Sequence, residues 1–267
     1  MSDFTAKFPT LLDIYTNSIE QFADRPLFGT KRGDTWEWTT YGEFGAMVDN
    51  TRSGLAGLGI GLGDKVAIIA DNREEWAVVA YAAYGLGAAV VPMYEAQTTE
   101  NWAFVLEDSD SRAVFVSTPD VAERLDTVRD SIEGLEYLFV MEGSAGEGWG
   151  TLADLQETGS KLPVGMTEVG EDEIAGFVYT SGTTGKPKGV LLTQKNLAYN
   201  VSAVTDVFPI YPTDRTLSFL PWAHAFGQTV ELHTVFAMGG STAFATAVAE
   251  ITSNLPEVKP TMLVSVP

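Results

Sequence analysis

The sequence contains no cysteine, only 2 histidines and few basic residues. The absence of cysteine excludes disulfide bonds, thiolate metal sites and a thiol nucleophile on the protein. The 36 acidic residues outnumber the 16 basic ones and give a formal net charge of −20. This charge excludes nucleic acid as an expected partner and disfavours electrostatic docking on anionic membranes. The 267 residues, 45% of them hydrophobic, suffice for a sizeable buried core.

A long uninterrupted hydrophobic segment is also missing. The first residues, MSDFTAKFPTLLDIY, lack the basic-then-apolar pattern of a secretion signal. The longest uncharged run, residues 77–94, has a marginal length for a membrane span, but Gly85, Gly87 and Pro92 interrupt it. We therefore predict a buried helix and a buried strand there, with no transmembrane segment. The expected location is cytoplasmic, and peripheral association at the inner membrane face is the alternative.

Strand-like and helix-like apolar patterns alternate along the chain. KVAII (65–69) and AVFVS (113–117) are typical buried strands, and NREEWAVVAYAAYGL (72–86) has the composition of a buried helix. This order predicts an α/β fold with mostly parallel sheets flanked by helices. LFGTK and TWEWT predict a strand pair, after which Thr40 and Glu43 form a capping box that starts a helix.

A glycine-rich run at residues 54–69, GLAGLGIGLGDKVAII, lacks the G-x-G-x-x-G spacing of a dinucleotide-binding fingerprint. It also follows a predicted helix and precedes a predicted strand, which is the reverse of the order that this fingerprint requires. We interpret the run as a helix end with glycine caps.

The segment FVYTSGTTGKPKGVLLT (177–193) is rich in glycine, hydroxyls and lysine. It is not a Walker A motif, because Thr180 occupies the position of the first glycine and Pro187 follows Lys186. Strand-like residues on both sides predict a strand–loop–strand element that holds an anion with backbone N–H groups. Thr193 is the predicted N-cap of the next helix. The predicted anion-binding residues are Thr180, Ser181, Gly182, Thr183, Thr184, Gly185 and Lys188.

The local charge supports an anion site, although a surface hairpin without a ligand is the alternative. Residues 174–258 contain 4 bases and 5 acids, so nearly all of the net charge lies elsewhere in the chain. The acidic residues 171–173 lie in a polar connector and are predicted to be solvated. The two histidines, His224 and His233, are too few for a metal site, and His233 is predicted to be structural.

Three stretches resemble one enzyme family. YTSGTTGKPKGVLLTQKNL (179–197) closely resembles the phosphate-binding signature of the adenylate-forming superfamily, which includes acyl-CoA synthetases, luciferases and peptide-synthetase adenylation domains. LSFLPWAHAFGQTVELH (217–233) resembles the acyl and adenylate pocket segment of long-chain fatty acyl-CoA synthetases. The NREEW and VPMY runs resemble the same subgroup, and the resemblance extends from about Phe8 to Pro267.

The resemblance implies an enzyme that uses ATP, Mg²⁺ and coenzyme A. A medium- or long-chain fatty acid would become acyl-AMP and then acyl-CoA, with release of pyrophosphate and AMP. Lys188 would be catalytic, Thr184 would help to order Mg²⁺, and His224 would act near the carboxylate and the α-phosphate. A packed histidine that caps a helix is the alternative for His224. The residues implied at the substrate pocket are Trp222, His224, Phe226 and Gly227.

Members of this family are at least twice as long as this chain. The resemblance therefore implies an N-terminal AMP-binding domain fragment, with a first α/β part at about 1–170 and the phosphate-loop and acyl-pocket part at 171–267. The remaining sheet, the barrel and the C-terminal lid with its lysine would be missing, so we expect no thioester formation from residues 1–267 alone. The run TMLVSV (261–266) is predicted to be a strand with an open edge.

Two other classes of function remain open. One is a different carboxylate activator, which would pass the acyl group to a carrier protein or to a luciferin-type oxidation. The other is a nucleotide-binding module without catalysis.

Overall fold

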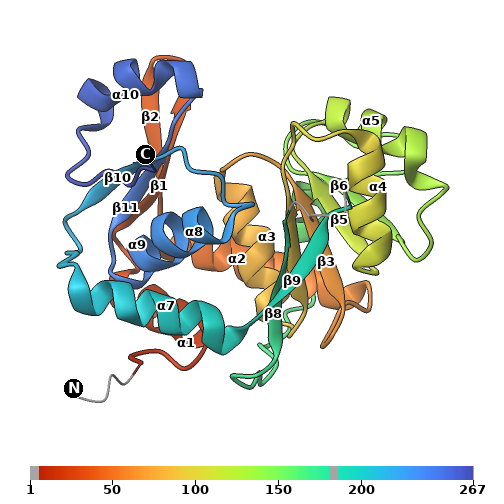
Figure 1. Cartoon of the computed structure of the whole chain (residues 1–267), viewed down its shortest axis with the longest axis horizontal. Helices are drawn as coiled ribbons and strands as arrows, with labels where there is room; N and C mark the ends of the chain where they lie inside the picture. Colours follow the sequence, from red (N-terminus) through yellow and green to blue (C-terminus); the bar gives the residue numbers. More distant parts are fainter. Residues whose placement is uncertain (1–5, 181–185, 267) are drawn as a thin grey trace.

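The computed structural model describes residues 6–180 and 186–266, which fold around two β-sheets (Figure 1). The strands of the larger sheet are β3 (Lys65–Ile69), β4 (Ala89–Met93), β5 (Ala113–Val116), β6 (Tyr137–Val140), β7 (Gly150–Thr151), β8 (Ile174–Thr180) and β9 (Lys188–Thr193). The strands of the smaller sheet are β1 (Pro26–Arg32), β2 (Thr35–Thr40), β10 (Arg215–Ser218) and β11 (Ser241–Phe244).

Parallel pairing dominates both sheets. The larger sheet has the order β7-β6-β5-β3-β4-β8-β9, in which only the β8–β9 pair is antiparallel. The smaller sheet has the order β10-β11-β1-β2, in which only the β1–β2 pair is antiparallel. The predicted α/β fold with mostly parallel sheets flanked by helices is confirmed, as is the predicted pairing of LFGTK with TWEWT.

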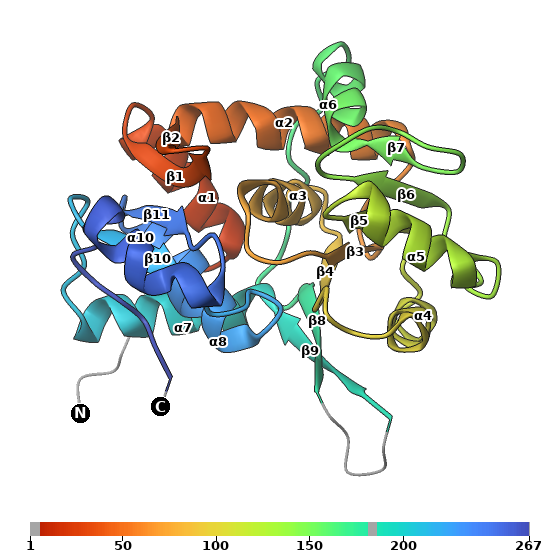
Figure 2. The ribbon, with the colours of Figure 1, turned by 90° about the horizontal axis from the view of Figure 1, so that it is seen from above.

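Helices cover both faces of the larger sheet. In chain order the helical segments are α1 (Leu11–Phe22), α2 (Tyr41–Gly57), α3 (Glu74–Tyr84), α4 (Thr99–Asp108), α5 (Pro119–Arg129), α6 (Leu152–Ser160), α7 (Gln194–Val207), α8 (Ala225–Gly227), the π-helix η1 (Gln228–Thr234), α9 (Val235–Ala237), the 3₁₀-helix η2 (Val248–Glu250) and α10 (Ile251–Val258). Helix α3 lies between the two sheets, and α4 and α5 lie beyond the larger one (Figure 1 and Figure 2).

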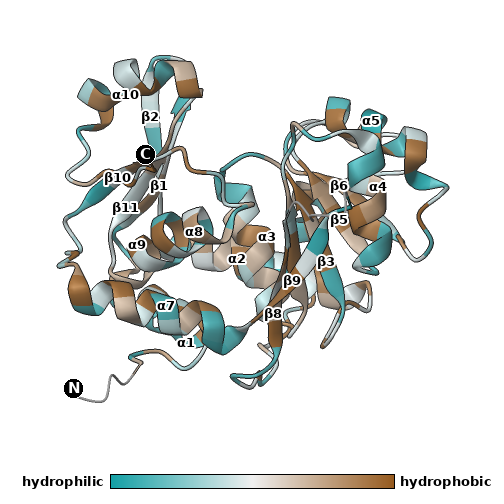
Figure 3. Ribbon diagram, in the orientation of Figure 1, coloured by the Kyte–Doolittle hydropathy of each residue, from teal (hydrophilic) through white to brown (hydrophobic). Residues whose placement is uncertain are grey.

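The core follows from the alternation of side chains along the central strands, whose apolar residues are visible in Figure 3. Val66 and Ile68 of β3 join the cluster formed with α1, α2 and α3. Ala67 and Ile69 of the same strand join the cluster formed with α4 and α5. Because successive strand residues point to opposite faces, a strand covered on both sides must be apolar throughout.

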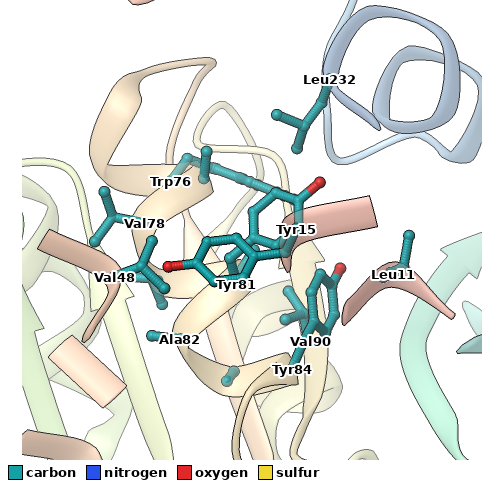
Figure 4. Packing of buried hydrophobic residues seen from close by; sticks show 14 of the residues in the cluster. Leu11, Tyr15, Val48, Trp76, Val78, Tyr81, Ala82, Tyr84, Val90 and Leu232 are labelled. Carbon is teal, nitrogen blue, oxygen red and sulfur yellow. The ribbon is translucent and has the colours of Figure 1, made fainter. Parts of the chain in front are cut away.

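Aromatic side chains fill the space between the sheets (Figure 4). Tyr15 of α1 stacks on Tyr81 of α3, with 5.5 Å between ring centroids. Tyr84 meets Tyr81 edge to face at 5.8 Å. Burial raises the pKa of all three phenols, so these side chains are neutral packing groups.

Threonine caps set the starts of several helices. Thr40 and Glu43 form the predicted capping box of α2, and Thr193 caps α7 as predicted, with Asn196 as its reciprocal partner. The glycine-rich run after α2 is a helix end, as predicted, and Gly59 and Gly63 take φ angles of +80° and +83°. Only glycine adopts such angles without strain.

Both sheets contain strands from either side of residue 170. The β8–β9 hairpin joins the larger sheet beside β4, with Gly176 opposite Val90. Strand β11 joins the smaller sheet beside β1, with Thr242 opposite Phe28. The sequence boundary near residue 170 therefore crosses a shared core.

Two segments differ from the sequence-based expectation. Residues 261–266 do not form a strand, because only Met262 pairs, in an isolated bridge with Thr216, and a ladder needs consecutive pairs. Helix α6 was not predicted, although Thr151 caps its start by accepting from the backbone N–H of Asp154. No helix in the described ranges has the length and hydropathy needed to cross a membrane.

Candidate active site

The two strands predicted on either side of the glycine-rich loop are confirmed. Strands β8 and β9 form a hairpin that projects from the larger sheet in Figure 2, and Thr180 lies opposite Lys188 where the strands separate. Both residues are exposed. The other predicted anion ligands, Ser181, Gly182, Thr183, Thr184 and Gly185, lie outside the described residues. Their contacts, including the magnesium role of Thr184, stay predictions.

The two lysines of the hairpin have different surroundings. Lys186 places its Nζ 5.3 Å from the centroid of the Phe104 ring on α4. The Tyr179 hydroxyl donates a 2.7 Å hydrogen bond to Asp108 at the end of the same helix. Among the described residues, Lys188 forms no ion pair. Helix α4 therefore anchors the hairpin through Tyr179 and Lys186.

The hairpin lies at the edge of the sheet formed by the carboxyl ends of its parallel strands, which is where ligands usually bind. Strands β3, β4 and β8 are parallel, so their carboxyl ends lie on one edge. Asn72 follows β3, Tyr94 follows β4, and Thr180 ends β8. In open α/β sheets, ligand sites form in the crevice beyond these strand ends.

A hollow of about 320 Å³ opens beside this edge. Its lining residues are Tyr94, Leu220, Pro221, His224, Phe226, Gly227 and Val266. The structure therefore brings three of the four predicted pocket residues together in one place. Tyr94, Leu220, Pro221 and Val266 were not predicted as lining residues. Two sequence signals lay near them: Tyr94 ends the VPMY run, and Leu220 and Pro221 lie within the pocket-like segment 217–233.

A second hollow, of about 570 Å³, lies beside the first, and Phe226 lines both. Its lining is mainly apolar, with Asp214 as its one carboxylate. The other lining residues are Val204, Phe208, Pro209, Ile210, Val230, Thr261, Met262, Leu263, Val264 and Ser265. The two hollows are therefore adjacent and mainly apolar, and His224 lines the first.

The helix-capping alternative considered for His224 is confirmed, while its role near the carboxylate and the α-phosphate stays a prediction. It is the N-cap of α8, where its Nδ1 accepts a 3.2 Å hydrogen bond from the backbone N–H of Phe226. An accepting Nδ1 fixes the neutral tautomer with its proton on Nε2. Nε2 is therefore the ring nitrogen that can contact a ligand in the hollow.

Trp222 does not line the hollow. Its side chain is fully buried and packs edge to face on Trp76 at 5.5 Å and on Phe244 at 5.5 Å. The backbone turns between Trp222 and His224, so the two side chains face different environments. Trp222 therefore supports the lining of the hollow from the core side.

Two ionisable groups are buried in the π-helix η1. The Glu231 carboxyl is fully buried, and this desolvation raises its pKa to about 7. Burial lowers the pKa of His233 to about 3, and its Nδ1 lies 2.9 Å from the Tyr81 hydroxyl. The structural role predicted for His233 is confirmed.

Metal ligation by clustered side chains has no support in the ranges that the structure covers. No group of three or more His, Asp or Glu side chains among the described residues could hold a metal ion. The acidic run at 171–173 is exposed as predicted, and Glu171 forms a 2.8 Å salt bridge with Lys195.

The fold is that of the N-terminal domains of adenylate-forming enzymes. The structure superposes on a long-chain-fatty-acid-CoA ligase from Archaeoglobus fulgidus with a TM-score of 0.86. That match has 23% sequence identity and covers 99% of this chain and 53% of the other. The sequence matches the model of the AMP-binding enzyme family over residues 15–267, and the chain belongs to this family.

Curated relatives share the same region. The long-chain-fatty-acid–CoA ligase FadD15 of Mycobacterium tuberculosis is 31% identical over 87% of this chain. A long-chain-fatty-acid–[acyl-carrier-protein] ligase of Arabidopsis thaliana, AEE15, is 26% identical over 98% of it. The chain spans 39% and 38% of the lengths of these two relatives.

Proposed function

We propose that this chain is the phosphate- and acyl-binding part of an ATP-dependent fatty acid–CoA ligase. Medium- or long-chain acids would react with ATP to give acyl-AMP and pyrophosphate, and coenzyme A would then displace AMP to give acyl-CoA. The observation that carries the proposal is the apolar double hollow that begins at His224, on the sheet edge where the Thr180–Lys188 hairpin stands. The apolar hollows suit a hydrocarbon tail, and the hairpin suits phosphate.

The chemistry needs positioning rather than a protein nucleophile, which agrees with the absence of cysteine. In this proposal the Lys188 ammonium and the backbone N–H groups of the hairpin stabilise the negative charge that develops on pyrophosphate. The Nε2–H of His224 donates to the carboxylate or to the α-phosphate oxygen and orients the two for attack.

Magnesium would neutralise phosphate charge during the reaction. Near the hairpin the described residues supply the Thr180 hydroxyl and the Lys188 ammonium rather than a cluster of carboxylates. The ammonium would pair with phosphate and cannot ligate a metal, so the site fits Mg²⁺ that would be held chiefly through substrate phosphates and water, with one hydroxyl such as that of Thr184. We place the protein in the cytoplasm, with peripheral contact at the inner membrane face as the alternative.

We expect the complete enzyme to prefer octanoate and palmitate over acetate. Each methylene buried in the apolar hollows contributes about 0.8 kcal/mol, or roughly fourfold in kcat/KM. The measurement is ATP-dependent pyrophosphate release with the three acids in competition. A preference for acetate or for an amino acid would contradict the fatty-acid assignment.

Replacing Lys188 with Ala should lower kcat/KM for ATP roughly 10- to 150-fold, which corresponds to the loss of a charged hydrogen bond worth about 1.5–3 kcal/mol. ATP–pyrophosphate exchange measures the effect. Lys186→Ala is the matched control, because Lys186 lies in the same loop but its ammonium rests on Phe104. Equal effects of the two substitutions, or wild-type exchange in Lys188→Ala, would contradict the phosphate role.

Transfer to a carrier protein is the second candidate, and the name of the Arabidopsis relative favours keeping it. Supplying coenzyme A and a phosphopantetheinyl carrier protein to the same acyl-AMP reaction distinguishes the two acceptors. Residues 1–267 alone are proposed to bind ATP weakly and to form no thioester.

A further inference from the structure

The six residues 218–223, here called the loop, begin with the last residue of β10 and lead to the hollow. The loop carries Leu220 and Pro221, which line the hollow, and it ends directly before His224. The positions of these three residues relative to a bound acyl group therefore depend on the conformation of this loop. Two side chains, those of Asn72 and Glu231, and the backbone at Gly227 hold it in place.

Asn72 holds the first side. It lies between β3 and α3 of the larger sheet, whereas the loop begins in the smaller one. Its Nδ2 donates to Ser218 Oγ at 2.9 Å and to the Leu220 carbonyl at 2.7 Å. Its Oδ1 accepts from the Trp222 backbone N–H at 2.8 Å. The Asn72 amide thus binds every second residue of the loop, at positions 218, 220 and 222.

Glu231 holds the opposite side. Its buried carboxylate accepts from the Ser218 hydroxyl and, at 3.5 Å, from the Leu220 backbone N–H. The Ser218 hydroxyl therefore accepts from Asn72 while it donates to Glu231. The Ser218 hydroxyl, here called the relay, thus links the hydrogen bonds of Asn72 to those of Glu231. A change in one of these two residues therefore alters the hydrogen bonding of the other.

Gly227 closes the third side. A Cβ at this position would lie 2.5 Å from the Pro221 carbonyl oxygen and 3.0 Å from that of Leu220. The backbone of α8 therefore packs directly on the loop, and the loop has no space to move toward it. The hydrogen bonds of Asn72 and Glu231 restrict the movement of the loop in the other directions.

We propose that Asn72 and Glu231 are positioning residues that fix Leu220, Pro221 and His224 and thereby set the discrimination between acyl chains. Neither lines either hollow, so both act through the loop. The inference rests on the proposed fatty-acid activation. A displacement of about 1 Å at a reacting group is enough to slow catalysis by roughly 100-fold.

The test uses Asn72→Ala in the complete enzyme. We expect kcat/KM for palmitate to fall at least tenfold. The palmitate-to-octanoate ratio, meaning the ratio of the two kcat/KM values, should move toward 1. The KM for ATP should stay within about twofold, because the hairpin is unchanged. Gln156→Ala is the matched control, since Gln156 is also a half-buried amide that joins two elements, through a 3.1 Å bond to Thr51, but far from the hollow in the chain and in the fold. It should leave kcat/KM for palmitate and the palmitate-to-octanoate ratio at wild-type values.

Ser218→Ala supplies a second and milder variant, which removes only the relay. It should shift the palmitate-to-octanoate ratio in the same direction by a smaller amount, and in the double variant with Asn72→Ala the two effects should be less than additive. An unchanged ratio in Ser218→Ala, or in Asn72→Ala, overturns the inference, as does an equal shift in Gln156→Ala. Absence of fatty-acid-dependent pyrophosphate release by the wild-type enzyme would instead overturn the proposed function, and this inference with it.

Discussion

Replacing Trp222 with Ala should lower the free energy of unfolding by about 3–5 kcal/mol, the usual cost of removing a large aromatic side chain from a core. The indole is fully buried and contacts the rings of Trp76, Phe28 and Phe244. Phe28 and Phe244 belong to strands of the smaller sheet and Trp76 belongs to helix α3, so the cavity would open between the smaller sheet and α3. Because domains are stable by only about 5–15 kcal/mol, the loss would be large.

Guanidinium denaturation of the variant and the wild type measures this difference. Trp36→Ala is the control, since Trp36 is half-buried on the smaller sheet and its Nε1 donates to Glu257 at the surface. Its loss should be clearly smaller. A Trp222→Ala variant that loses less than about 1 kcal/mol would contradict a packing role.

Acidification should destabilise the protein through His233. The unfolded imidazole has a pKa near 6.5, whereas burial lowers the pKa in the folded state to about 3. Between these values the unfolded chain binds a proton that the folded chain does not. The effect of His233 on the free energy of unfolding is therefore absent above pH 6.5. As the pH is lowered toward 3, this effect reduces the free energy of unfolding by up to about 1.4 kcal/mol per pH unit.

The measurement is the free energy of unfolding from pH 7 to pH 4 for wild type and for His233→Leu. The variant should lose stability less steeply with acid, even though it also loses the Tyr81 hydrogen bond and so starts lower at pH 7. Glu231, whose folded pKa is raised to about 7, contributes in the opposite sense, with stability that is present below about pH 4.5 and lost as the pH rises through 7. It is common to both proteins and cancels in the comparison. Parallel curves for wild type and His233→Leu would contradict the assignment.

Local patterns predicted the elements of this fold, because strand alternation, capping and turn chemistry depend on neighbouring residues. The capping box at Thr40 and the strand–loop–strand element before Thr193 are of this kind. The lining of the hollow depends on how distant segments meet. Nothing local indicates that the Trp222 ring faces Trp76, or that Asn72 reaches the loop about 150 residues later.

The failure at residues 261–266 has a related cause. An apolar, β-branched run is compatible with a strand, but pairing also requires a neighbouring strand in register. Here the backbone N–H groups of Thr261 and Met262 both donate to the same carbonyl, that of Arg215, and the ladder does not continue. Sequence composition contains no information about that register.

The pairing of β1 with β11 can form only late during synthesis on the ribosome. Phe28 and Thr242 are adjacent in the finished sheet but about 210 residues apart in the chain. At about 5–20 residues per second, roughly 10–40 s pass before β11 is made, and until then one edge of β1 has no partner. The nascent β1–β2 hairpin is thus an open template for other chains, and holding it apart from them is a natural task for a chaperone.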